Sequence, residues 1–199
     1  RLWIKRDDLT GLATGGNKTR KLEFLIADAQ AQGADVVITA GGPQSNHCRQ
    51  TAAAAARYGL ECHLVLGGDR RPPLGNLLLD QLLCATVHWP HKKGRHRKMD
   101  ALAADLRRAG RSPYVIPIGG SNGIGALGYV LAMFELVKQL ADLSLSVDRI
   151  VVATSSGGTQ AGMSLGAALA GFEGRITPIS IDQTPADNFV DEVTQIEAA

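Results

Sequence analysis

Short apolar runs alternate with stretches of helical period from residue 36 to the end of the chain. The runs are rich in Val and Ile and nearly continuous in hydrophobic residues, which is typical of parallel strands covered on both faces. Their alternation with helices indicates β-α units. We therefore predict an α/β fold with strands at residues 36–40, 62–66, 86–89, 114–118, 150–153 and 176–181.

The intervening stretches have the spacing of amphipathic helices, and three of them are followed by a glycine that can end a helix. Open α/β sheets bind ligands where the carboxyl end of a strand meets the start of a helix. Functional residues are therefore expected at the strand-to-helix junctions. The predicted helices are residues 46–58, 74–83, 98–109, 124–140 and 160–170.

Composition indicates a soluble globular protein, because 45% of the 199 residues are hydrophobic and 20% are charged. The length suffices for one large domain or two small ones. Residues 1–5 resemble a strand already under way, and the helical pattern of residues 192–199 has neither a cap nor a stop signal. We therefore interpret the chain as a fragment that lacks both ends.

A formal net charge of +2 is too small to predict a nucleic-acid or membrane partner. The basic run at residues 91–98 is interpreted as a solvated loop entering a helix, with nucleic-acid contact as the alternative. No uninterrupted apolar run reaches the roughly 18 residues of a membrane span. Three cysteines without CxxC spacing predict neither disulfides nor a zinc site and favour a reducing cytoplasm.

The first junction with candidate chemistry is residues 15–21, Gly-Gly-Asn-Lys-Thr-Arg-Lys. Asn17 can cap the helix that follows, which leaves Lys18 in its first turn. The positive end of the helix dipole repels an ammonium group there and lowers its pKa. A deprotonated amine can attack an aldehyde to form a Schiff base. The alternative is a surface lysine whose side chain extends away from the helix start.

The second junction is residues 41–47, Gly-Gly-Pro-Gln-Ser-Asn-His, directly after the strand predicted at 36–40. Backbone N–H groups at the helix start and the hydroxyl of Ser45 suit an anionic carboxylate. Ser45 and Asn46 can equally be simple N-caps. Cys48 lies in the first turn of the same helix, where its pKa can be depressed, but we expect a packed thiol.

The third junction is residues 155–162, Ser-Ser-Gly-Gly-Thr-Gln-Ala-Gly. Its glycines let the backbone approach a phosphate closely, and its N–H groups and hydroxyls can donate hydrogen bonds to it. It matches neither the P-loop nor the dinucleotide fingerprint, and a tight turn is the alternative. Together the three junctions supply an amine nucleophile, a carboxylate site and a phosphate cradle, which suits pyridoxal 5'-phosphate (PLP) and an amino acid.

Several motifs in order resemble the family of D-cysteine desulfhydrase and 1-aminocyclopropane-1-carboxylate (ACC) deaminase, and the resemblance covers nearly the whole chain. The segments at residues 5–10 and 15–23 are similar to the family's cofactor-lysine signature. The other matching segments are residues 44–47 (Gln-Ser-Asn-His), 49–52, 117–121, 125–129 and 156–162.

The resemblance implies the tryptophan-synthase-β-like PLP fold (fold type II), with two open twisted parallel-sheet domains. Residues 1–21 and 131–199 would belong to the larger PLP-binding domain, and residues 22–130 would form the smaller α/β domain. The active site of this fold lies between its two domains. A homodimer is also implied, and no metal is expected.

The resemblance also implies roles for individual residues. Lys18 would form the Schiff base with the cofactor and then move the proton at the substrate's Cα. Ser45 would be the second catalytic residue. Ser45 and His47 would receive the substrate carboxylate, and Asn46 would hydrogen-bond the cofactor's ring oxygen. The phosphate would be held by Lys21 and the loop of Gly157, Gly158, Thr159, Gln160, Ala161 and Gly162.

Two reactions compete within this family. A D-cysteine desulfhydrase eliminates the β-substituent of the substrate and yields pyruvate, ammonia and sulfide. An ACC deaminase opens a cyclopropane ring whose Cα carries no proton. Deaminases of the family usually carry glutamine after Ser-Asn, so His47 favours the desulfhydrase. The remaining alternatives are β-replacement, a threonine-dehydratase reaction and a relative without turnover. The resemblance implies that the residues which separate the activities belong to a carboxyl-terminal portion that this sequence does not include.

Overall fold

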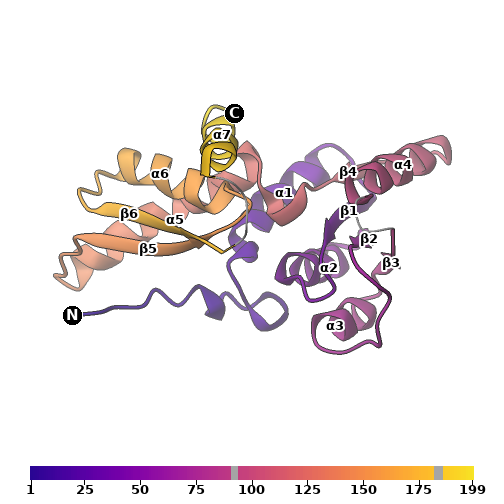
Figure 1. Ribbon diagram of the computed structural model, residues 1–199, viewed down its shortest axis with the longest axis horizontal. Coiled ribbons are helices and arrows are strands. Elements are labelled where there is room, and N and C mark those ends of the chain that lie inside the picture. Colours follow the sequence, from indigo (N-terminus) through magenta and orange to yellow (C-terminus); the bar gives the residue numbers. More distant parts are fainter. Residues whose placement is uncertain (91–93, 182–185) are drawn as a thin grey trace. The chain divides into compact units, whose positions relative to one another are not determined.

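The computed structural model describes residues 1–90, 94–181 and 186–199 and contains two compact units. Unit 1 comprises Arg1–Gly119 and unit 2 comprises Gly120–Ala199. Each unit holds a parallel sheet with helices against it (Figure 1). The predicted α/β class with parallel sheets is therefore confirmed, and the two units are described in turn.

Unit 1 has a four-stranded parallel sheet in the order β3-β2-β1-β4. The central strand β1 is buried along its whole length, as its continuous apolar sequence predicts. Its neighbours start in register with it, since Val36 pairs with Glu61 on one side and with Pro113 on the other. The strands are β1 (Val36–Gly41), β2 (Glu61–Leu66), β3 (Thr86–His88) and β4 (Pro113–Val115).

Four α-helices and short 3-10 turns complete unit 1. The helices are α1 (Lys18–Ala31), α2 (Asn46–Tyr58), α3 (Asn76–Leu82) and α4 (Arg95–Arg108). The 3-10 turns are η1 (Asp7–Leu9), η2 (Leu12–Thr14) and η3 (Ile118–Gly120), the last at the boundary of the units. Helix α4 packs on β1 through Met99, Leu102 and Ala103, and this contact is a main part of the core of unit 1.

The described residues of unit 2 form a two-stranded parallel sheet and three helices. The strands are β5 (Arg149–Thr154) and β6 (Arg175–Ser180), and the helices are α5 (Gly123–Asp142), α6 (Gly158–Ala170) and α7 (Ala186–Glu197). Its core joins Tyr129 and Met133 of α5 to Met163 and Ala167 of α6. Helix α6 follows β5 directly, so its first turn lies at the carboxyl end of that strand.

All six predicted strands and all five predicted helices are present, with ends that differ by a few residues. The strand expected at 114–118 stops at Val115, because the chain turns into η3, where Gly119 has a φ of 72°. The helix expected at 98–109 begins earlier, at Arg95. It thus takes in part of the basic run at 91–98, of which residues 91–93 lie outside the described residues.

The strand expected at residues 1–5 is a wrong prediction. No strand forms there, and Leu2 and Ile4 are 91% and 75% exposed. A strand needs a neighbour for its backbone hydrogen bonds, and these apolar residues have none in the described part of unit 1. The unit boundary at Gly119 also differs from the expected domain limits, since residues 1–21 are part of unit 1. Their assignment to a larger cofactor domain stays a prediction.

Helix α5 is apolar enough, with a mean hydropathy of 1.4, and long enough to cross a membrane by those two criteria alone. It is the only such helix in the described residues. Its buried side chains, including Tyr129 and Met133, pack on α6 in the core of unit 2. This packing is typical of a core helix, because both partners bury apolar faces against each other.

Candidate functional site

Lys18 is the first residue of α1 and follows a tight glycine turn. Gly15 and Gly16 have φ values of 78° and 132°, which side chains with a Cβ rarely adopt. The hydroxyl of Thr10 closes the turn, since it accepts a hydrogen bond from the Gly16 N–H at 2.9 Å and lies 2.8 Å from the Gly16 carbonyl oxygen. The turn therefore fixes the chain immediately before Lys18.

Asn17 does not cap α1, in contrast to the sequence-based expectation. Its backbone is already helical, at φ −60° and ψ −21°, and its side chain makes no capping hydrogen bond. Gln50 of α2 takes that role, because its Oε1 accepts a hydrogen bond from the Lys18 backbone N–H at 3.1 Å. A capping residue distant in sequence was not detectable from the local motif.

Gln50 is fully buried and satisfies three groups of the lysine turn. Besides capping Lys18, its Nε2 donates to the Gly16 carbonyl at 3.2 Å and to the Thr19 hydroxyl at 2.7 Å. An added Cβ on Gly16 would lie 3.1 Å from Gln50 Oε1, so the glycine also permits the close approach of this side chain. Helix α2 thus sets the position of the Lys18 backbone.

The electrostatic environment favours a neutral amine at Lys18. Burial lowers the pKa of Lys18 from its ordinary value. Burial, followed by the charge of Lys18, lowers the pKa of Lys21 to about 7. The direction agrees with the sequence-based expectation, and the cause found for it is desolvation by burial. Lys21 is 1% exposed, and its Nζ donates to the Gly119 carbonyl at 3.2 Å.

The second junction lies in the same unit, at the start of α2. Ser45 is the N-cap, with its Oγ accepting a hydrogen bond from the Cys48 N–H at 3.2 Å. The N-cap alternative is therefore confirmed for Ser45, and its hydroxyl proton can still be donated to a ligand. Asn46 is exposed. The first-turn N–H groups of α2 have no carbonyl partner within the helix, which suits an anion.

His47 lies inside unit 1 and is 4% exposed. Its Nε2 is 2.9 Å from the hydroxyl of Thr39 on β1, and that hydroxyl also donates to the Ile116 carbonyl at 2.9 Å. A hydroxyl has one proton, so Thr39 must accept from His47 Nε2–H. Burial and the charges of Lys18 and Lys21 lower the pKa of His47 to about 3, which keeps the ring neutral.

Cys48 is a packed thiol, as expected. It is 0% exposed, and burial raises its pKa to about 12, so no thiolate forms near neutral pH. Cys62 is buried as well, and its pKa is also raised by burial. Both cysteines are free. We therefore assign both cysteines a packing role in the interior of unit 1.

The third junction forms the start of α6 in unit 2. Gly157 has a φ of 74°, and no side chain caps the helix. The Ser156 hydroxyl is 2.7 Å from the hydroxyl of Ser121, which brings the motif at 117–121 to this loop. Thr159 is 8% exposed, and its neighbours Gly157 and Gly158 are buried. The N–H groups in the first turn of α6 can thus donate hydrogen bonds to a phosphate.

The end of the predicted phosphate loop has a packing role. A Cβ on Gly162 would collide with the Ala126 carbonyl oxygen and would lie 2.7 Å from the Tyr129 Cβ, both on α5. Ala161 is 1% exposed beside it. Gln160 Oε1 and the Thr154 hydroxyl are buried without a hydrogen-bond partner among the described residues. These two groups are polar and unsatisfied next to the loop, which is consistent with a ligand there.

The structure therefore gathers Lys18, Lys21, Ser45, Asn46 and His47 in unit 1, while the predicted phosphate loop belongs to unit 2. Sequence reasoning missed Arg49 and Gln50, although both lie in the motif at 49–52. No sequence signal indicated either role, because Asn17 offered a local cap for α1 and the contact with α2 joins residues far apart in the chain.

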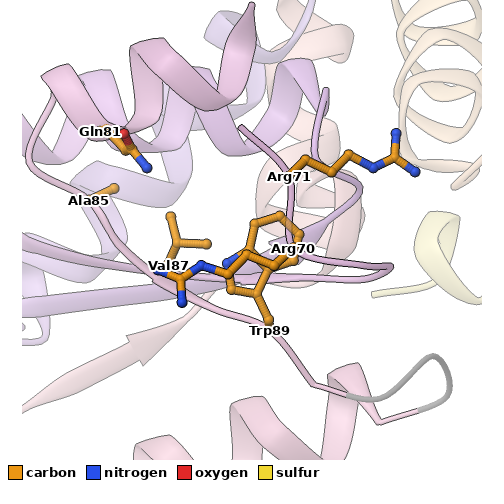
Figure 2. Close-up of a pocket in the computed structure, with 6 residues that line it drawn as sticks. All are labelled: Arg70, Arg71, Gln81, Ala85, Val87 and Trp89. Carbon is orange, nitrogen blue, oxygen red and sulfur yellow. The ribbon is translucent and has the colours of Figure 1, made fainter. Parts of the chain in front are cut away.

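A separate surface hollow in unit 1 contains none of the predicted site residues. Figure 2 shows its lining, in which Arg71 is directed away from Val87 and Gln81. The lining residues are Arg70, Arg71, Gln81, Ala85, Val87 and Trp89. Four of them lie on α3, on β3 or beside these elements. The hollow is open and its arginines are exposed, so it does not resemble a buried cofactor site.

Comparison with known proteins agrees with this geometry. A family model described as "Pyridoxal-phosphate dependent enzyme" matches residues 1–197. A bifunctional D-cysteine desulfhydrase/ACC deaminase of Arabidopsis thaliana, described as mitochondrial, is 47% identical over 205 residues, which is 96% of this chain and 51% of that protein. A D-cysteine desulfhydrase of Klebsiella pneumoniae is 42% identical over 198 residues, covering 94% of this chain and 58% of the relative.

Solved structures give the same result. The crystal structure of an ACC deaminase homologue matches with a TM-score of 0.85 and 42% identity, over 98% of this chain and 62% of that one. The crystal structure of a T.th. threonine deaminase matches with a TM-score of 0.65 and 18% identity, over 82% of this chain and 49% of that one, and supports the fold alone. The chain spans about half to three-fifths of the length of the relatives that it matches.

Proposed function

Because the chain belongs to the pyridoxal-phosphate-dependent enzyme family, we propose that the full protein is a PLP-dependent lyase of a small amino acid, most simply D-cysteine. The observation that carries this proposal is the desolvated amine of Lys18, positioned on a rigid turn at a helix start. The fold-type II architecture and the names of the relatives are consistent with a carbon-sulfur lyase or a deaminase.

The residues present fit the cofactor. A Schiff base needs an amine that is neutral near pH 7, and burial moves Lys18 in that direction. A phosphate needs hydrogen-bond donors, and the first-turn N–H groups of α6 in unit 2 can supply them. In unit 1 the amine of Lys21 is a further nitrogen donor. The exposed carboxamide of Asn46 can donate to a ring oxygen.

PLP supplies an electron sink when it is bound, and the chain supplies the acid-base and positioning groups. The Lys18 amine would be the group that accepts the proton from the substrate's Cα. The Ser45 hydroxyl and the first-turn N–H groups of α2 can hold the substrate carboxylate. His47 is neutral and buried, so we assign it to supporting Thr39 and β1 behind this turn.

The substrate choice rests on the reaction chemistry and on residue 47. D-Cysteine has a Cα proton for Lys18 to remove and a β-sulfur that can leave as sulfide, with pyruvate and ammonia as the other products. ACC lacks the Cα proton, so its ring opening to 2-oxobutyrate and ammonia needs a different first step. His47 after Ser45-Asn46 supports the desulfhydrase, and ACC deamination is the second candidate, favoured by the similarity to an ACC deaminase homologue.

We also propose that the protein works as a homodimer in a reducing compartment such as the cytoplasm, without nucleic-acid or membrane partners. The free cysteines support a reducing environment, since Cys48 and Cys62 are buried thiols without a disulfide. The small net charge gives no basis for binding phosphate backbones.

The test uses full-length protein purified with PLP. We expect a visible Schiff-base absorbance band that borohydride reduction fixes to Lys18, together with sulfide and pyruvate released from D-cysteine but not from L-cysteine. Lys18→Ala should lose the band and at least about 10³-fold in turnover. Lys138→Ala, which removes an exposed lysine paired with Asp142, serves as the matched control and should retain both.

A colourless wild-type protein would contradict the cofactor assignment. Formation of 2-oxobutyrate from ACC, without sulfide from D-cysteine, would replace the desulfhydrase by the deaminase. A band without turnover of any of these substrates would indicate a relative that binds the cofactor without catalysis.

A further inference from the structure

Arg49 of α2 connects three segments around the candidate site. It is 7% exposed, and its Nη2 donates to the Gly15 carbonyl at 2.6 Å. Its Nη1 donates to Asn46 Oδ1 at 3.2 Å and to Asn76 Oδ1 at 3.0 Å. One guanidinium thus contacts the lysine turn, the start of α2 and the start of α3. Because a guanidinium can only donate, all three partners must present oxygen to it.

This requirement fixes the orientation of the Asn46 carboxamide. Its Oδ1 accepts from Arg49 and also from Asn76 Nδ2 at 2.9 Å. Asn76 cannot be flipped, because its own Oδ1 faces Arg49 while its Nδ2 also donates to the Gln44 carbonyl at 2.8 Å. The oxygen of Asn46 is therefore held toward the protein, and its NH₂ group is the end left to donate to a ligand.

The buried charge of Arg49 has a counter-charge in α3. Asp80 lies one turn after Asn76 and is 1% exposed. Burial raises its pKa to about 7, and the charge of Arg49 acts in the opposite direction. Asp80 Oδ1 and Arg49 Nε are both buried without a hydrogen-bond partner among the described residues. Helix α3 therefore supplies both a hydrogen-bond partner and a charge partner for Arg49.

We propose that Arg49, held by Asn76, is a positioning residue that locks the Asn46 carboxamide with its N–H donor toward the cofactor's ring oxygen. The proposal rests on the proposed function, since it takes Asn46 to be the residue that meets that oxygen. The same guanidinium holds the Gly15 carbonyl, so the orientation of Asn46 and the position of the lysine turn depend on one side chain.

The ring-oxygen hydrogen bond has a spectroscopic consequence. A donor to that oxygen stabilises its anionic form and weakens its hold on the neighbouring Schiff-base proton. Loss of the donor should therefore raise the pH at which the Lys18 band titrates, by about one unit if the bond is of the strength usual for charged partners. A purely structural role of Arg49 would lower stability without this shift.

The experiment titrates the Lys18 absorbance band of the full-length holoenzyme against pH. Asn46→Ala should raise the titration midpoint by about one unit. Arg49→Lys should raise it by less, because Asn76 Nδ2 still donates to Asn46 Oδ1. The double variant should show no more than Asn46→Ala alone, because both substitutions act on the same bond. Asn76→Ala removes one of the two donors to Asn46 Oδ1 and should shift the midpoint less, in the same direction. Asn76→Ala therefore still tests the proposal if Arg49→Lys fails to fold.

Arg57→Lys at the far end of α2 is the control and should leave the midpoint unchanged. An unshifted midpoint in Arg49→Lys and Asn76→Ala, with a shift in Asn46→Ala, would overturn the positioning role and leave the proposed function intact. Additive shifts in the double variant would overturn it as well. The absence of any band in the wild type would instead contradict the proposed function, and the inference with it.

Discussion

The candidate cofactor-binding elements of the two units are built by different means. In unit 1 the lysine turn is held by buried polar side chains, chiefly Gln50 and Arg49, which reach it from another helix. In unit 2 the loop at the start of α6 is shaped by glycines, with a positive φ at Gly157 and a close helix contact at Gly162. A reacting amine needs a side-chain scaffold, whereas a phosphate cradle needs backbone N–H groups that are free to donate.

The largest effect that tests this difference is expected from Gln50→Leu in unit 1. The substitution leaves the Lys18 N–H, the Gly16 carbonyl and the Thr19 hydroxyl without their buried partner. We expect a loss of about 4 kcal/mol in the free energy of unfolding, measured by urea denaturation. The control is Gln30→Leu on the exposed side of α1, which should change stability by less than about 0.5 kcal/mol.

The corresponding change in unit 2 is Gly162→Val. Its side chain would meet the α5 backbone at Ala126 and the Cβ of Tyr129, so α5 and α6 must separate. A loss of about 3 kcal/mol is expected, again by urea denaturation. Ala168→Val on the exposed face of α6 is the matched control. Equal stability of the two variants would show that the helix contact is not close.

The third prediction concerns the pH dependence of stability through Lys21. The unfolded chain keeps this proton up to the ordinary lysine pKa of 10.5, whereas burial lowers the folded pKa to about 7. The unfolded state therefore binds more protons between these values, and stability must rise with pH across that window. Between pH 7 and pH 9 the gain attributable to Lys21 is about 2 kcal/mol in the cofactor-free protein.

Lys21→Met should remove this part of the pH dependence, and Lys138→Met should not, since Lys138 is exposed. The measurement is the difference between wild-type and variant unfolding free energies at several pH values. A constant difference from pH 7 to pH 9 would show that Lys21 is not desolvated in solution.

The smallest expected effect is that of Gly157→Ala at the start of α6. Its positive φ strains any residue with a Cβ, at a cost of about 1 kcal/mol. Gly171→Ala also places a Cβ at a positive φ, but in the left-handed helical region and without a neighbour within 4 Å, so it should cost no more than Gly157→Ala. Only Gly157→Ala should also weaken PLP binding, measured by cofactor titration. Equal PLP affinity in both variants would show that Gly157 does not contribute to phosphate binding.

Local patterns were sufficient to predict most of the fold. The strands and helices follow from apolar runs and helical spacing, and α2 begins and ends at the predicted residues, Asn46 and Tyr58. The strand expected at residues 1–5 failed because pairing is a property of two segments, and an apolar sequence does not supply its own partner. The early end of β4 likewise depends on the turn at Gly119.

The positions of Lys18 and Ser45 at helix starts were predictable from the sequence, whereas the contacts that support them were not, and their catalytic roles stay predictions. Lys18 and Ser45 were recognisable from junction chemistry, because glycines and small polar residues at a helix start carry a local signature. The capping of α1 by Gln50 was not, since it joins residues 32 positions apart. The neutral state of His47 was also hidden, because it depends on burial behind β1 and on two lysine charges.

The proximity of Lys18 and Lys21 means that the cofactor would affect the stability of the folded chain as well as its chemistry. Burial of both amines, together with the charge of Lys18 beside Lys21, disfavours their protonated forms in the cofactor-free protein. A dianionic ligand that binds only the folded state would offset that effect, and each tenfold excess of free ligand over its dissociation constant adds about 1.4 kcal/mol of stability. The cellular supply of vitamin B6 would then set the lifetime of the protein against proteolysis, in addition to its activity.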